Sequence, residues 1–165
     1  MEIQKIRHKV DIIIEKLGIK DAPTPLEKVA DFFALPIIYY PKFPDSVSGT
    51  VVQEEDLLAI GVNEKHPRVR QRFTIAHELG HYILGHDTSK ILDDKFDKNS
   101  DKEREANKFA SELLMPIEIL KRDLSNKKWN IPALAKRYVV SEQAMTIRLM
   151  EANLINNPNL QGIDN

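Results

Sequence analysis

Two histidines four residues apart, with a glutamate directly after the first, form the cluster with the clearest chemical potential. They are His77, Glu78 and His81, within the segment RFTIAHELGHYILGH. On an α-helix, positions i and i+4 lie on one face about 5–6 Å apart, so the two imidazoles can bind one metal ion. Glu78 is rotated by about 100° from His77 and is placed to act as a general base. The spacing predicts a zinc-dependent peptidase, and the alternative is a helix that carries two histidines by chance.

A third metal ligand is needed, because catalytic zinc usually has three protein ligands and one open position. His86 and Asp87 follow the pair closely in the sequence. Enzymes with a third ligand at the position of Asp87 place a glycine three residues before it, so that the chain can turn back to the metal. Leu84 stands there instead. The spacing therefore argues against Asp87, and we expect a structural or supporting role for His86.

A better candidate lies downstream, in the segment EREANKFASELLMP at residues 103–116. Ser100 followed by Glu103 predicts a capping box, which would engage the Glu103 side chain at the start of a helix. Glu105 lies at the edge of the apolar face of that helix, where a carboxylate needs a partner. A metal ion held by the two histidines would be such a partner, so Glu105 is the favoured third ligand. The competing acids are Glu103, Glu112 and Glu118.

The elements that must position these residues follow from apolar periodicity and turn signals. Helices are expected over residues 3–17, 25–33, 67–84, 100–115, 117–124, 131–138 and 141–154, with Thr24 capping the second and Gly85 ending the third. Strands are expected at 36–41, 47–53 and 57–63, the last two as a hairpin. The segment 87–99 is predicted to be a loop. The pattern indicates a compact α+β fold with a small antiparallel or mixed sheet.

Composition limits the possible functions. The 165 residues suit one domain, or one domain with a small appendage, and 42% of them are hydrophobic, enough for a core. A net charge of -1 argues against a protein that coats nucleic acid or an anionic membrane. With no cysteine, disulfides and cysteine-based zinc fingers are excluded. Since no segment reads as a signal peptide or a membrane span, we expect a soluble, cytoplasmic protein with no membrane partner.

Two segments together resemble the ImmA/IrrE-type zinc metallopeptidases, a gluzincin-like family. The first is IGVNEKHPRVRQRFTIAHELGHYILGH (60–86), and the second is EREANKFASELLMP (103–116). A weaker similarity continues through residues 134–155. The resemblance implies a minimal zincin-like domain over residues 1–116. A helical region with a helix-turn-helix-like outline would then follow at 117–155, and a polar tail at 156–165.

Carried over position by position, the resemblance implies that His77, His81 and Glu105 bind zinc and that Glu78 is the general base. It also implies an endopeptidase that cleaves a specific protein, a helix-turn-helix transcriptional repressor, and so derepresses genes of a mobile element or a stress response. Some members of the family are instead partners in toxin–antitoxin or phage-defence modules. The predicted hairpin would supply an edge strand to which a substrate segment adds.

The rival interpretation is a regulator with a non-proteolytic zinc site, which binds DNA or sequesters a partner protein. Residues 134–155 have the outline of a DNA-binding helix-turn-helix, with Arg148 expected on an accessible position of the second helix. Residues 117–165 hold seven basic and five acidic side chains, so their net charge is only +2. That is little for binding phosphates, and direct DNA binding is the less favoured prediction.

Overall fold

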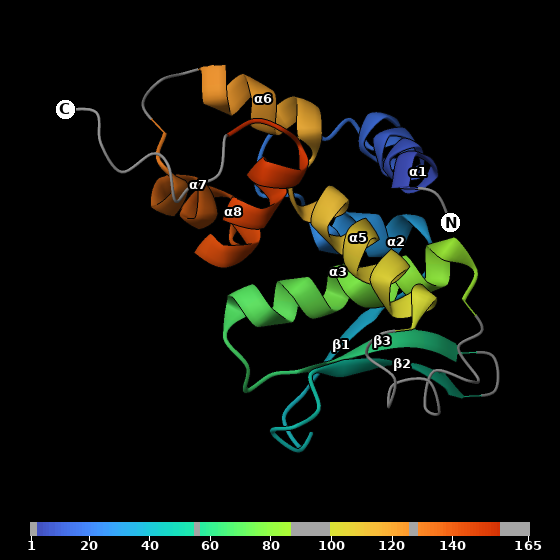
Figure 1. Ribbon diagram of the computed structural model, residues 1–165. Coiled ribbons are helices and arrows are strands. Elements are labelled where there is room, and N and C mark those ends of the chain that lie inside the picture. Colours follow the sequence, from blue (N-terminus) through green and yellow to red (C-terminus); the bar gives the residue numbers. More distant parts are fainter. Residues whose placement is uncertain (1–2, 55–56, 87–99, 126–128, 156–165) are drawn as a thin grey trace.

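A computed structural model of the chain describes residues 3–54, 57–86, 100–125 and 129–155, which form an α+β fold (Figure 1). In sequence order, the elements in these ranges are α1 (Ile3–Lys16), α2 (Leu26–Phe32), β1 (Ile37–Tyr40), β2 (Gly49–Glu54), β3 (Leu57–Asn63), α3 (Arg68–Leu84), α5 (Asp101–Leu114), α6 (Ile117–Ser125), α7 (Ile131–Tyr138) and α8 (Glu142–Glu151). The predicted fold class and elements are confirmed. The predicted loop at 87–99 and the tail at 156–165 lie outside the described residues.

The three strands form one mixed sheet with the order β1-β3-β2. β1 pairs parallel with β3, with Ile37 opposite Ile60, and β2 pairs antiparallel with β3, with Val51 opposite Ile60. β2 and β3 form the expected hairpin, so β2 is an edge strand among the strands described. Helix α3 packs on β2 and β3, and its other side contacts α5 (Figure 1). The histidine-bearing helix is thus held between the sheet and a second helix.

A glycine sets how closely α3 and α5 approach. A Cβ atom added at Gly80 would lie 3.1 Å from the Ala106 carbonyl oxygen and 3.2 Å from the Phe109 Cβ atom. These distances are shorter than ordinary van der Waals contact, so a side chain here would push the helices apart. Phe109 itself is fully buried in the core. The close contact brings the first turns of α5 next to the end of α3 that carries the histidines.

A buried ion cluster joins α1, α5 and α8. Arg148 of α8 is fully buried; its Nη1 donates to Glu112 Oε1 at 2.7 Å and its Nε to the Met115 carbonyl at 3.1 Å. Arg7 of α1 donates to the same carboxylate at 3.1 Å. Burial raises the pKa of Glu112, but the hydrogen bond from Arg7 and the charge of Arg148 outweigh it and hold this pKa below its ordinary 4.5. The expectation of an accessible Arg148 is wrong, because this side chain neutralises a buried carboxylate.

Thr24 has a different role from the predicted helix cap. The residue before α2 is Pro25, and no side chain caps this helix. The Thr24 hydroxyl instead donates to the Leu113 carbonyl of α5 at 2.8 Å, and its carbonyl accepts from Arg72 of α3 at 2.8 Å. A buried hydroxyl has to find a partner, and here tertiary contacts supply it. Thr24 therefore links the start of α2 to both helices of the candidate site.

None of the described helices has the length and apolar character needed to cross a membrane. The boundary expected at residue 116 and the cytoplasmic location stay predictions.

Candidate metal centre

His77 and His81 lie one turn apart near the end of α3, as their spacing predicted. Their Nε2 atoms are 3.0 Å apart, and the two rings meet edge to face with centroids 4.6 Å apart. His81 is buried and His77 is half-buried. Both rings therefore turn the same nitrogen toward one point between α3 and α5.

The carboxylate that reaches this point belongs to Glu103 of α5. Its Oε1 lies 3.1 Å from His81 Nε2, and its Oε2 lies 3.4 Å from His77 Nε2. Two atoms bound to one zinc ion at 2.0–2.2 Å and at a tetrahedral angle are about 3.3–3.6 Å apart. The distances of 3.0, 3.1 and 3.4 Å come within a few tenths of an ångström of that spacing. His77, His81 and Glu103 therefore fit the donor set of a zinc site, with two imidazoles and one carboxylate.

This geometry favours Glu103 over the predicted third ligand, Glu105. Among the described residues, Glu105 is not in the cluster of possible metal ligands, and its Oε2 lies 3.1 Å from His86 Nε2. The Ser100 half of the predicted capping box is present, because the Ser100 hydroxyl accepts from the Glu103 N–H at 3.3 Å. The Glu103 carboxylate reaches across to α3, where the close helix contact brings it beside the histidine pair. Asp87, the other alternative, lies outside the described residues.

His86 lies next to His81 because of the way α3 ends. Gly85 adopts a left-handed conformation with φ of 72°, its N–H donates to the Tyr82 carbonyl at 3.1 Å, and the His86 N–H donates to the His81 carbonyl at 3.0 Å. This pair of bonds is a Schellman motif, which favours glycine at that position. It folds the chain back so that His86 Nδ1 lies 3.0 Å from His81 Nδ1. His86 thus joins His81 to Glu105.

Both histidines of the cluster have a partner on their second ring nitrogen. If Nε2 of each ring faces a metal ion, Nδ1 carries the proton. His77 Nδ1 then donates to Asn107 Oδ1 at 3.0 Å, and His81 Nδ1 donates to His86 Nδ1. Burial, and next the charge of Lys102, lower the pKa of His86 below its ordinary 6.5, which favours the neutral ring that this chain of bonds needs. Such partners fix the tautomer and orientation of a metal-binding histidine.

Glu78 is buried on α3, with 3% of its surface exposed, and is not part of the ligand cluster among the described residues. Its position directly after His77 agrees with a role beside the metal rather than as a ligand. Phe73, one turn before His77, stacks on the His77 ring with centroids 6.0 Å apart. No pattern in the sequence points to Asn107 or Phe73 as part of this site. His86, in contrast, carried a signal, because a glycine cap predicts a chain that folds back on the helix.

The fold and the cluster define a metallopeptidase-like α+β domain. The chain belongs to the IrrE N-terminal-like domain family, Peptidase_M78, whose model matches residues 40–150. The resemblance seen in the sequence is thereby confirmed. A solved structure of a "Mycobacterium tuberculosis transcriptional regulator" has a similar fold, with a TM-score of 0.67 and 20% sequence identity. The match covers 96% of this chain and 49% of that one, so this chain spans about half its length. A comparison with curated proteins gave no match.

Proposed function

We propose that this chain is a zinc-dependent endopeptidase that cleaves a specific protein, a helix-turn-helix repressor. The observation that carries the proposal is the convergence of His77, His81 and Glu103 on one point, with a buried Glu78 beside them. The proposed ligand set contains Glu103 in place of Glu105, which the sequence favoured. When bound, zinc supplies the Lewis acid that peptide hydrolysis needs.

The protein side chains would then divide the remaining work. Glu78 removes a proton from the water that attacks the scissile carbonyl carbon. As the C–N bond breaks, the same carboxyl group delivers that proton to the leaving amine nitrogen. Asn107 and His86 hold the two imidazoles in place through their Nδ1 atoms. A preorganised site of this kind avoids reorientation during the reaction.

The repressor as substrate rests on the family resemblance. The similar solved structure is named a transcriptional regulator, which is in keeping with a protein that acts in gene control. Edge strand β2 offers a place where an extended segment of the substrate can add to the sheet. A protease of this kind should digest casein slowly, because it recognises one partner rather than any unfolded chain.

The test compares cells that express the wild-type chain with cells that express Glu78→Gln. This variant keeps the three proposed metal ligands and lacks the general base. Labelling of new protein N-termini, followed by mass spectrometry, should reveal a cleaved repressor only with the wild type. The purified, zinc-loaded protein should then cut that repressor at the same bond. If Glu78→Gln has the full biological effect and no new N-terminus appears, the proposal is wrong and sequestration of a partner explains the effect.

The DNA-binding alternative gains no support from the described residues. Arg148, the one basic residue of α8, is fully buried against Glu112. The side of α8 that faces solvent includes the apolar residues Ile147 and Met150, which are 48% and 39% exposed. A helix that reads DNA needs cations and hydrogen-bonding side chains at its surface. This surface is better suited to an apolar partner.

A further inference from the structure

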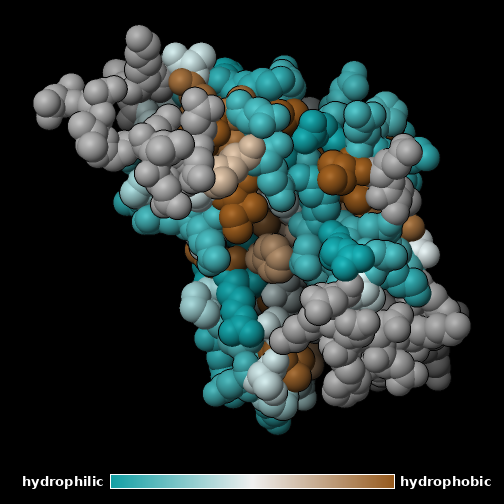
Figure 2. All heavy atoms as spheres, in the orientation of Figure 1, coloured by the Kyte–Doolittle hydropathy of each residue, from teal (hydrophilic) through white to brown (hydrophobic). Residues whose placement is uncertain are grey.

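A groove of about 700 Å³ lies between α3, α5 and α8. Its walls include Val69 and Phe73 of α3, Ser111 of α5, and Ala144 and Ile147 of α8. Figure 2 shows apolar residues gathered in the middle of this face, where Figure 1 places these helices. Phe73 and Ile147 are 41% and 48% exposed, so the groove offers accessible apolar surface. The groove has the size and character of a binding site.

The groove continues the metal site along the same two helices. On α3, Val69, Phe73, His77 and His81 are spaced four residues apart, so they form one row along the helix. The first two line the groove, and the last two are proposed metal ligands.

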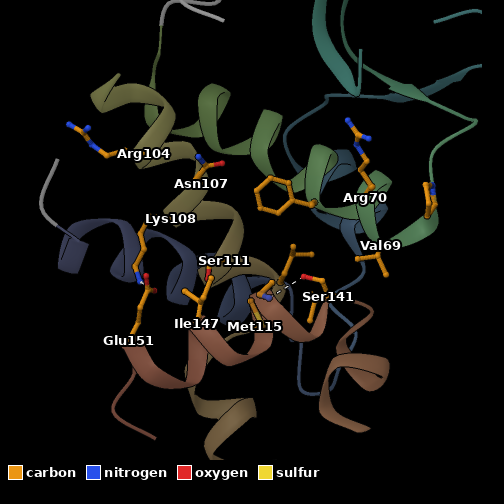
Figure 3. A pocket seen from close by; sticks show the side chains of 15 residues that line it. Val69, Arg70, Arg104, Asn107, Lys108, Ser111, Met115, Ser141, Ile147 and Glu151 are labelled. Carbon is orange, nitrogen blue, oxygen red and sulfur yellow. Dashed lines mark hydrogen bonds and ion pairs between the residues drawn. The ribbon is translucent and has the colours of Figure 1, made fainter. Parts of the chain in front are cut away.

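Helix α5 repeats this arrangement in the opposite direction. Glu103, Asn107 and Ser111 are also spaced four residues apart. Glu103 belongs to the metal cluster, whereas Asn107 and Ser111 line the groove (Figure 3).

Two side chains belong to both the groove and the metal site. Phe73 stacks on the His77 ring and lines the groove, and Asn107 accepts from His77 Nδ1 and lines the groove. A polypeptide whose scissile bond lies at the metal therefore meets the groove next. From His77 to Val69 the helix rises by about 12 Å. An extended chain covers that distance with about three to four residues.

The edge of the groove carries positive charge. Arg70 is exposed, and its Nη2 donates to the hydroxyl of Ser48 at 2.8 Å, a partner with no charge. Lys108 is neutralised by Glu151 at 2.6 Å at one end of the groove (Figure 3). Arg104 also lines the groove, where its Nη2 is paired with Asp101, so the positive charge at this edge rests mainly on Arg70. Acidic residues that flank an apolar segment would be favoured at such an edge.

We infer that this groove binds an apolar segment of about three to four residues, flanked by acidic residues, on one side of the bond that the enzyme cleaves. This inference rests on the proposed function, because it describes the substrate of the same site. It identifies the chemistry of the substrate: the cleaved region must expose apolar side chains that are normally buried in a folded protein. Cleavage then requires a substrate that is locally opened.

The test measures binding of two fluorescent peptides of equal length to zinc-loaded Glu78→Gln protein. One peptide has a run of about four leucines flanked by aspartates, and the other has serines in place of the leucines. Fluorescence polarisation should show the leucine peptide binding at least about tenfold more tightly. Ile147→Asp should remove this preference, and Ser111→Tyr, which fills the groove without adding charge, should weaken binding of the leucine peptide. Ile12→Asp is the matched control, since Ile12 is 37% exposed on α1 and does not line the groove.

The inference is overturned if the two peptides bind equally, or if Ile147→Asp and Ser111→Tyr both bind like the control. The inference is also overturned if sedimentation experiments show dimers that compete with the peptide and are absent in Ile147→Asp. That result would assign the groove to a second copy of the chain. The proposed function can fail separately. If the leucine peptide binds but no protein is ever cut, the inference about the groove stands and the peptidase function is wrong. If both peptides are cleaved at the same rate and Ile147→Asp leaves that rate unchanged, the peptidase function stands and the inference about the groove is wrong.

Discussion

Replacing Glu103 and Glu105 separately by glutamine should distinguish a metal ligand from a residue that supports one. Zinc sites bind with about 10–16 kcal/mol over four ligands, or roughly 2.5–4 kcal/mol for each. Loss of the Glu103 carboxylate, which lies 3.1 and 3.4 Å from the two histidine nitrogens, should therefore weaken zinc binding about 100- to 1,000-fold. Glu105 contacts His86, which in turn contacts His81, so its replacement should weaken binding about 10- to 100-fold.

The route through His86 can be tested with a double-mutant cycle. If Glu105 acts by holding His86 against His81, then Glu105→Gln should have no further effect on zinc affinity once His86 is alanine. Glu103→Gln should keep its full effect in the same background. The coupling follows from the 3.0 Å contact between the Nδ1 atoms of His86 and His81 and the 3.1 Å contact between His86 and Glu105.

Zinc affinity is measured by competition with a chromophoric chelator at pH 7, and circular dichroism of each variant controls for folding. Glu118→Gln serves as a matched control, since this glutamate lies on α6 in an ion pair with Lys121. A Glu105→Gln protein that loses as much zinc affinity as Glu103→Gln, or more, would refute the ligand assignment drawn from the geometry.

Three further predictions concern stability, measured by urea unfolding. Gly80→Ala should lower the free energy of unfolding by about 1–3 kcal/mol, and also weaken zinc binding, because the added methyl group separates α3 from α5; a protein of unchanged stability would contradict the tight contact. Glu112→Leu should cost about 3–5 kcal/mol at pH 7, because it leaves Arg148 buried without its carboxylate. The pKa of Glu112 is lowered in the folded protein, so the stability that this group supplies is present above pH 4.5 and is lost as the pH falls through the folded pKa. The free energies of unfolding of the wild type and Glu112→Leu should therefore converge in acid. A difference that stays constant with pH would count against the cluster. Val139→Gly should raise stability by up to about 1 kcal/mol, because a β-branched residue is strained at φ of 53°; a loss of stability there would show that the Val139 side chain contributes more by packing.

Local signals in the sequence were sufficient for the elements of the fold. Gly85 ends α3 in the left-handed conformation and Ser100 caps α5, as predicted, because both interactions lie within a few residues of the chain. The histidine pair was predictable for the same reason, since a helix fixes the relation of His77 to His81. The second helix was chosen as the source of the third ligand from its apolar edge, and the family resemblance supported that choice.

The identity of the third ligand depends on how the helices pack, which local sequence signals do not show. The capping-box rule gave the Glu103 side chain a local partner, whereas the contact at Gly80 brings that side chain to the histidines of α3. Periodicity shows which face of a helix is apolar, but it does not show where two helices cross. Arg148 was misplaced for a related reason: a charged residue reads as exposed unless its buried partner, here Glu112, is known.

The position of Asn107 has a thermodynamic consequence. Its side chain orients His77 and also forms part of the groove wall, so a ligand that shifts Asn107 changes the affinity of the histidine cluster for metal. Linkage requires the reverse effect to be equal: metal loading must change the affinity of the groove by the same factor. Occupancy of the two places is then cooperative or antagonistic, but not independent. In a cell where free zinc is scarce, the presence of substrate would help to decide which copies of the protein carry the metal.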